Sequence, residues 1–220
     1  EGRVDEAVAA LLDAIAATDD PSASTLLGGL AYMDDDWDGA RRSWEHAHGR
    51  WRQLGDRRGA ARVAALLGEL HWSALGNHAA GRGWLQKAER LLDGEGRCVE
   101  RGYVNLALAA CEATDLDDLE ARAAEALDLA LEFGDVDLEV RALADSGYAL
   151  VSQGRTAEGF ARLDEALATI TGGQVRDLGV AAVAFCAMLS ACDQAGAMGR
   201  AEEWTRLVRE LFLDRLGGRP

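Results

Sequence analysis

The feature that most constrains this chain is a helix-turn-helix pattern that returns about every 40 residues. Its clearest copy spans residues 135–173, where two amphipathic segments meet at the dipeptide Gly154-Arg155. Residues spaced by three and four positions share one face of a helix, so each segment carries a narrow seam of small and apolar side chains. The seam residues are Leu143, Gly147 and Leu150 in the first segment and Gly159, Leu163 and Ala166 in the second. The two seams predict a pair of closely packed antiparallel helices.

The same seam position can be followed through the whole chain. It is occupied by Ala14, Ala47, Ala88, Ala126, Ala166 and Val208, in steps of 33, 41, 38, 40 and 42 residues. This period predicts helix hairpins at 21–55, 56–94, 97–134, 135–173 and 174–213, with half a repeat at 1–20 and a tail or linker at 214–220. We therefore expect an all-α protein of about 11 helices. No hairpin in such an array buries its apolar face alone, so the hairpins are expected to stack as an α-solenoid in one domain, 1–216.

The predicted helix ends rest on residues that stop or start a helix. Gly55-Asp56 and Gly134-Asp135 each join a glycine that can end one helix to an aspartate that can cap the next. Pro21 cannot continue the first helix, and Ser22 is the expected cap of the second. The acidic run 34–36 resembles a metal site, but an acidic cluster before a helix favours a cap, which is our interpretation.

Composition and charge restrict the possible partners. The chain has 220 residues and two prolines. Its formal net charge is −15, so its surface repels phosphate backbones, and this segment is not expected to bind nucleic acid. The four cysteines have no metal-ligand spacing, which favours buried free thiols in a reducing compartment. Without a signal peptide or an uninterrupted apolar run of about 20 residues, we expect a cytoplasmic protein that makes no membrane contact. The chain begins in mid-hairpin, so we expect it to be a piece of a longer protein.

Aromatic residues in the third expected helix allow two interpretations. Trp37, Trp44 and Trp51 lie on one face, with alanines between them. Three rings in register can form a shelf for an aromatic ligand. The alternative, which we favour, is packing between neighbouring hairpins, because the alanines let a second helix lie against the rings.

Residues that could carry catalysis are not grouped in the sequence. His46 and His48 are two positions apart and project from different sides of a helix, so they cannot share a metal as an i, i+4 pair does. Cys186 and Cys192 have no histidine or other base beside them in the sequence. We therefore expect no catalytic residues, no metal site and no cofactor, and a protein that is not an enzyme.

The spacing of small residues resembles the tetratricopeptide repeat. The resemblance lies at Leu27-Gly28, Ala40, Trp44 and Ala47, and again at Leu143, Gly147, Gly154, Gly159, Leu163 and Ala166. The family places small residues at the eighth, twentieth and twenty-seventh positions of a repeat of about 34 residues. The repeats here are longer, Glu69 stands where the family has glycine, and the closing proline is absent. The resemblance implies a right-handed superhelix of helix hairpins.

Longer stretches resemble the helical sensor region of bacterial LuxR-type transcription regulators, including relatives of the maltose-regulon activator. They are LGDRRGAAR at 54–62, RCVERGYV at 97–104, FGDVDLEVRAL at 133–143 and ALVSQGRTAEGFARLDEALA at 149–168. The resemblance implies a non-enzymatic segment that senses a ligand or a protein, while a separate domain outside this chain contacts DNA. The alternative is a free-standing adaptor that joins two proteins without sensing a ligand.

The repeat pattern also predicts which residues line a concave groove. They are Tyr32, Leu70, Arg101, Val104, Leu108, Arg141, Tyr148, Ser152, Ser190 and Asp193, together with Leu66, Ser73 and Cys186. The groove is expected to hold a peptide or protein partner or a small-molecule effector, and a homo-oligomer is possible. Arg101 and Arg141 can bind a carboxylate or phosphate. The alternative is that both are used in ion pairs within the chain, with Glu112 or Asp145.

Overall fold

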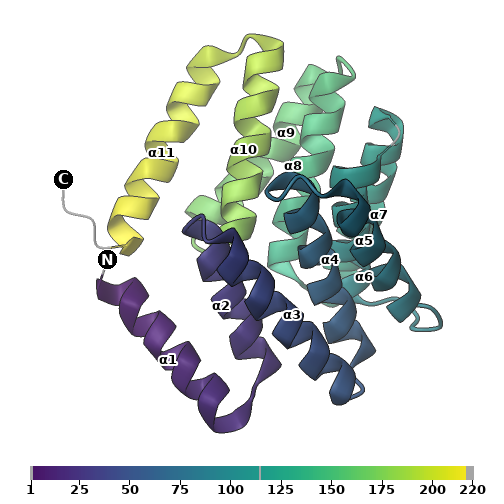
Figure 1. Ribbon diagram of the computed structural model, residues 1–220. Coiled ribbons are helices and arrows are strands. Elements are labelled where there is room, and N and C mark those ends of the chain that lie inside the picture. Colours follow the sequence, from purple (N-terminus) through teal and green to yellow (C-terminus); the bar gives the residue numbers. More distant parts are fainter. Residues whose placement is uncertain (1, 114, 217–220) are drawn as a thin grey trace. The chain divides into compact units, whose positions relative to one another are not determined.

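The computed structural model describes residues 2–113 and 115–216, and in these ranges the regular elements are eleven α-helices and no strands. This confirms the all-helical fold and the number of helices. The first six helices are α1 (Gly2–Thr18), α2 (Pro21–Met33), α3 (Trp37–Gln53), α4 (Arg57–Ser73), α5 (His78–Leu91) and α6 (Val99–Glu112). The other five are α7 (Leu116–Phe133), α8 (Val136–Ser152), α9 (Thr156–Thr171), α10 (Leu178–Ala195) and α11 (Met198–Leu216) (Figure 1).

Contacts divide the chain into two compact units, unit 1 (Glu1–Cys111) and unit 2 (Glu112–Pro220). The division falls at the end of α6, inside the hairpin predicted at 97–134. The single domain expected from the period stays a prediction. The α11 helix extends to Leu216, three residues into the segment expected to be a tail, and residues 217–220 and the side chain of Ala14 lie outside the described part.

Unit 1 is organised around α4, whose two sides enter two apolar clusters. On one side Val63, Leu67 and Leu70 pack with Ala40, Trp44 and Ala47 of α3. On the other side α4 packs with α5 and α6, through Ala61, Ala64, Ala65, Leu85, Ala88, Val104, Ala107 and Leu108. A helix that is apolar on two sides is buried between its neighbours. Most of unit 1 therefore depends on α4 for its core.

Trp44 of α3 packs against α2 of its own hairpin, and Trp51 packs against α4 of the next, so the favoured packing between hairpins is confirmed for Trp51. Trp44 is 4% exposed, and its Nε1 donates a hydrogen bond to the backbone oxygen of Thr25 at 3.0 Å. A Cβ atom on Gly28 would lie 2.4 Å from the indole ring of Trp44. Trp51 lies in the same way against Gly59, where an added Cβ would be 2.7 Å from its ring. Two glycines thus make room for two tryptophans.

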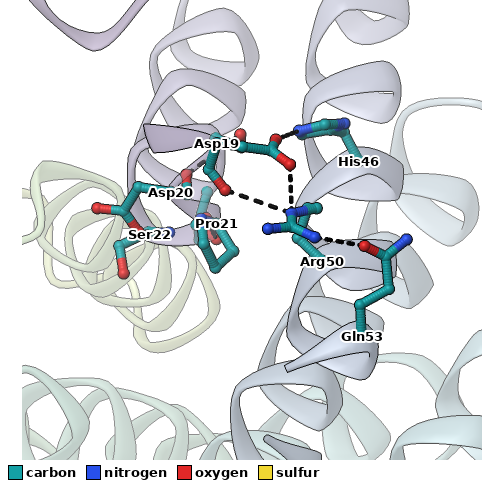
Figure 2. Close-up of polar contacts among 9 residues, drawn as sticks. Asp19, Asp20, Pro21, Ser22, His46, Arg50 and Gln53 are labelled. Carbon is teal, nitrogen blue, oxygen red and sulfur yellow. Dashed lines mark hydrogen bonds and ion pairs between the residues drawn. The ribbon is translucent and has the colours of Figure 1, made fainter. Parts of the chain in front are cut away.

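The turn between α1 and α2 is fastened to α3 by Asp19 (Figure 2). The carboxylate of Asp19 lies 2.8 Å from Nε2 of His46 and is paired with Arg50, which also contacts Gln53. The backbone at Asp19 has φ 51, a left-handed conformation that aspartate tolerates better than most residues. The side chain of Asp19 therefore joins this turn to α3.

The helix ends agree with the sequence in most places. Gly55 and Gly134 have φ values of 76 and 68, and the aspartates that follow them cap α4 and α8. Asp36 caps α3 by accepting a hydrogen bond from Gly39 N at 2.8 Å, which confirms the cap interpretation of the acidic run. The expected Ser22 cap is wrong, because Pro21 begins α2 and Asp20 accepts from Ser22 N. Proline suits the first turn of a helix, where its missing N–H has no partner to lose.

Unit 2 is built on the hairpin of α8 and α9, which cross at a pair of glycines. A Cβ atom on Gly147 would lie 2.7 Å from Cγ of Leu163 and 2.9 Å from the backbone oxygen of Gly159. One on Gly159 would lie 2.6 Å from the backbone oxygen of Gly147. The two backbones touch here, so neither position accepts a side chain. The α7 and α10 helices both pack against α8.

The α11 helix is joined to α9 by charged and aromatic side chains. The carboxylate of Asp164 accepts from Arg200 at 2.5 and 2.6 Å and from Nε1 of Trp204 at 3.2 Å. The guanidinium of Arg200 also lies 4.6 Å from the ring centre of Phe160. Val208 and Trp204 add apolar contacts with the core of unit 2. Polar bonds thus carry a larger share of the contact in this pair than in the α8–α9 hairpin.

Replacing glycine by alanine should have opposite effects on stability at the crossing of α8 and α9 and at an uncrowded helical position. Gly147→Ala should destabilise the protein by about 1 to 3 kcal/mol, because Leu163 or the α9 backbone must move. Gly83→Ala is the matched control, since an added Cβ there meets nothing within 4 Å. It should stabilise α5 by up to about 1 kcal/mol. Urea unfolding measures both, and equal midpoints for the two variants would contradict the crossing.

Candidate ligand-binding surface

Three polar side chains meet where α8 and α10 lie side by side. Ser152 donates a hydrogen bond from Oγ to Oε1 of Gln194 at 2.6 Å, and Gln194 donates from Nε2 to the hydroxyl of Tyr148 at 3.1 Å. Tyr148 and Ser152 are half-buried on α8, and Gln194 is exposed near the end of α10. The amide of Gln194 thus connects two of the predicted groove residues. Both hydroxyls stay within reach of a ligand because their bonds are formed at the surface.

We name the surface around these residues the α8–α10 surface. It consists of Tyr148 and Ser152 on α8 and of Ser190, Asp193 and Gln194 on α10. Ser190 and Asp193 are exposed and lie within four residues of Gln194. Hydroxyl, amide and carboxylate groups together can bind a polar ligand by hydrogen bonds. They include no nucleophile with a neighbouring base, so the arrangement favours binding over reaction.

Arg141 is engaged within the chain. Its Nε lies 3.1 Å from Oδ2 of Asp145, one helical turn away, and the two side chains are 12% and 14% exposed. This is the intramolecular pair that the sequence left as the alternative to a ligand contact. A pair so well covered is screened little by water and holds both side chains in place. Arg141 is therefore held in an ion pair within α8.

Of the groove residues predicted in unit 1, three lie in the core. Leu70 is 0% exposed, Val104 2% and Leu108 4%. A side chain with so little accessible surface contributes packing and offers no area to a ligand. Ser73 and Leu66 are respectively exposed and half-buried on the same helix as Leu70. The ligand groove predicted for unit 1 stays a prediction for its exposed members.

The other two groove residues predicted in unit 1 are Arg101 and Tyr32, and both contact their own chain. Arg101 donates from Nη2 to the backbone oxygen of Leu92 at 2.8 Å, at the end of α5. Arg57 donates to the backbone oxygens of Leu91, Arg90 and Asp93 in the same turn. Cations are favoured at the negative end of a helix, where backbone oxygens lack partners. Tyr32 packs its ring on Trp37, with ring centres 5.1 Å apart.

The histidines lie apart, as their spacing predicted. His46 faces the Asp19 turn, whereas His48 is buried, with Nδ1 3.0 Å from the backbone oxygen of Ala60 and its ring against Trp84. Burial lowers the pKa of His48 below its ordinary value. The hydrogen bond to Ala60 opposes this, and the charges of Lys87 and Arg52 lower the pKa further. His48 is therefore a neutral core residue at neutral pH.

The cysteines differ from the expectation at one position. All four are free thiols, and Cys98, Cys111 and Cys192 are buried, but Cys186 is exposed on α10. The prediction of burial is thus wrong for Cys186, because α10 is apolar on more than its buried face. Burial raises the pKa of the Cys192 thiol, which makes it a poor nucleophile. Within 2–113 and 115–216, no group of three or more His, Cys, Asp or Glu side chains is placed to hold a metal.

The α10 helix is unusually apolar for one that is only partly covered. Among the described helices it alone is long and apolar enough to cross a membrane, judged by length and composition. Its mean hydropathy is 1.6, and 33% of Leu178–Ala195 is buried. The buried residues belong to the core of unit 2.

Gln194 is the functional candidate that the sequence prediction missed. It lies 42 residues after Ser152, which is one repeat period, so a search for polar residues at equivalent positions would have found it.

No protein-family model matches the chain, and no curated protein matches it either. By its fold the chain is an all-helical protein of two compact units.

Replacing the arginine of the covered Arg141–Asp145 pair by alanine should lower the free energy of unfolding more than the same change in an exposed pair of equal spacing. Arg141→Ala should destabilise unit 2 by about 1 to 3 kcal/mol, because it leaves the carboxylate of Asp145 covered and without this cation. Arg122 pairs with Asp118 at 3.0 Å, also one turn apart, but the side chains are 33% and 29% exposed. Arg122→Ala should therefore cost less than about 1 kcal/mol. Urea unfolding compares them, and a larger loss for Arg122→Ala would refute this ranking.

Because His48 is buried and its pKa is lowered, unit 1 should lose stability in mild acid. In the unfolded chain a histidine has a pKa of about 6.5, so below that pH the unfolded state takes up a proton that buried His48 resists. The midpoint of urea unfolding should fall between about pH 7.5 and about pH 5.5. His48→Asn retains a donor for Ala60 and cannot titrate, so its midpoint should fall less. Five of the six tryptophans lie in unit 1, which makes their fluorescence a suitable readout, and identical pH profiles would exclude His48 as the cause.

Proposed function

We propose that the chain is a non-enzymatic, tetratricopeptide-like repeat scaffold that serves as the ligand- or protein-sensing segment of a bacterial LuxR-type transcription regulator. The observation that carries the proposal is the spacing of polar contacts. Ser152 and Gln194 are 42 residues apart, and Asp137 and Arg176 are 39 apart. Bonds at one repeat period are what an array makes when each hairpin contacts the next.

The close crossings within hairpins support the same proposal. In α4 and α5, a Cβ on Gly81 would lie 3.0 Å from the backbone oxygen of Gly68. In α8 and α9 the pair Gly147 and Gly159 meets in the same way. The same contact in two hairpins, one in each unit, fits a repeated building block. We propose that these hairpins stack as a right-handed α-solenoid, as the resemblance implies.

The sensing mechanism follows from where the polar residues lie. A ligand on the α8–α10 surface would exchange hydrogen bonds with Gln194, Tyr148 and Ser152, which connect two successive repeats. Such a ligand favours whichever separation of α8 and α10 suits it best, and so shifts the population of the repeat stack. An attached domain would respond to that shift, and only that domain would contact DNA. The proposal places the protein in the cytoplasm, where a transcription regulator acts.

The second candidate is an adaptor that joins two proteins without a small ligand. It is favoured by the exposed apolar side chains, which include Leu26 and Leu131, each 61% exposed. A sensor and an adaptor differ in their response to small molecules. A ligand that binds the folded state stabilises it by mass action, whereas an adaptor is indifferent to the same compounds.

Thermal unfolding with a panel of small carboxylates, phosphates and neutral polar compounds tests the sensing function. A true ligand at about 100 times its dissociation constant should stabilise the protein by about 2.7 kcal/mol. Gln194→Ala should abolish that stabilisation. Gln153→Ala is the matched control, because Gln153 also bonds one repeat away, to Asp117 at 2.8 Å, outside the α8–α10 surface.

Two outcomes would refute the proposal. If no compound in the panel changes the melting temperature, or if Gln194→Ala binds as the parent does, the α8–α10 surface is not a small-ligand site. The coding sequence offers a separate check. If its reading frame encodes no DNA-binding domain, the regulator assignment fails even where a ligand binds.

A further inference from the structure

The outer face of α10 is largely apolar and partly exposed. Figure 1 shows α10 beside α8 and α9, and its inner residues Val180, Ala184, Met188 and Ala191 are buried in unit 2. On the outer side Leu178 and Leu189 are 38% and 37% exposed. A helix with the hydropathy of a membrane span normally has partners on all sides. This face is therefore a candidate surface for contact with another molecule.

Cys186 lies at the centre of that face, both along the helix and around its axis. It is exposed near the middle of the 18-residue helix, with Ala182 one turn before it and Ser190 one turn after it. It is also opposite the buried side, since successive residues turn by about 100° around the axis. Gly179, Ala182, Cys186 and Ser190 are small, and small residues let two helices approach closely.

One basic and one acidic side chain are exposed near the two ends of α10. Between Leu178 and Cys192 the helix carries no charged residue. Arg176 is exposed just before the helix and Asp193 is exposed near its end. Asp137 accepts the backbone N–H of Arg176, and Asp177 accepts that of Gly179, so both carboxylates lie near Arg176 and are engaged with the backbone. The exposed guanidinium of Arg176 is the group at this end that can pair with a carboxylate of another molecule.

We propose that the outer face of α10 binds the same face of a second copy, with the two helices antiparallel about a two-fold axis at Cys186. In this arrangement Asp193 of each copy lies beside Arg176 of the other, and the apolar residues between them cover each other. A parallel pair would place like charges together. Two copies each with a net charge of −15 repel, and the uncharged stretch of α10 is where they can approach with the least repulsion.

A lipid bilayer is the other apolar environment that could cover this face, but the structure disfavours it. The buried side of α10 holds the core of unit 2, so the helix cannot enter a bilayer without losing that core. A surface-bound helix also gains from basic flanking residues, whereas this chain is strongly acidic. One helix against one helix buries less than the roughly 1,600 Å² of a standard interface, so we expect a weak dimer with a dissociation constant of roughly 10 to 100 µM. The dimer does not depend on the regulator assignment.

Crosslinking with a short bismaleimide tests the geometry. Cys186 is the one exposed thiol among the four, and on the two-fold axis it faces its own copy. The parent should form a covalent dimer and Cys186→Ser should not. The matched control places a cysteine at Leu131, which is 61% exposed on α7, in the Cys186→Ser background. That variant should remain monomeric, and crosslinking at an equal rate through Leu131→Cys would mean random collision and overturn the proposal.

Sedimentation equilibrium of charge variants tests the orientation. Arg176→Glu and Asp193→Arg should each weaken dimerisation about tenfold, because each turns two attractive pairs into repulsive ones. The double variant restores opposite charges and should return to within about threefold of the parent. Leu189→Glu should leave a monomer, while Leu131→Glu should not change the association.

Clear results would overturn the proposal. A protein that stays monomeric up to about 1 mM has no such interface. A double charge variant weaker than both single variants would exclude the antiparallel pairing. Binding of the monomer to neutral phosphatidylcholine vesicles, lost in Leu189→Glu, would assign the face to a membrane surface instead.

Discussion

The structure depends on close contact between helix backbones. At the crossing of α8 and α9 the backbone oxygen of each glycine lies where the other's Cβ would be, and α4 with α5 repeats the contact at Gly68 and Gly81. Such short separations are possible only with glycine on both helices. They bring the larger seam residues, such as Leu163 and Leu85, into full burial. The close packing of the apolar core therefore depends on these small residues, because larger ones would hold the helices apart.

The polar bonds add specificity to this packing, and arginine provides many of them. Among the 23 basic residues only Lys87 is a lysine. Arg57 and Arg101 bind carbonyl oxygens at the end of α5, and Arg200 holds both oxygens of Asp164. A planar guanidinium with several donors can serve two or three acceptors at fixed angles, which a lysine ammonium does less well. Arg57, Arg101 and Arg200 thus help to hold neighbouring helices and turns together.

The sequence predicted the helices well and the exposure of their residues poorly. Gly55-Asp56 and Gly134-Asp135 act locally, through one left-handed glycine and one capping carboxylate, so their effect can be read from the residues alone. Burial at Leu70, Val104 and Leu108 is different, because it depends on how deeply neighbouring helices cover each position. Periodicity assigns a residue to a face but does not give the distance to the next helix. The bond of Arg101 could not be predicted for the same reason, since its partner is a carbonyl oxygen that no sequence pattern marks.

The α10 helix connects the two proposals made for unit 2. Ser190, Asp193 and Gln194 belong to the α8–α10 surface, and the same helix carries the face proposed to meet a second copy. A ligand that contacts Asp193 would compete with Arg176 of the other copy for one carboxylate. Thermodynamic linkage then requires that the ligand weaken the dimer by the same factor by which dimerisation weakens ligand binding. A repeat scaffold with this linkage could report a ligand through its state of association, without any large change in the shape of either unit.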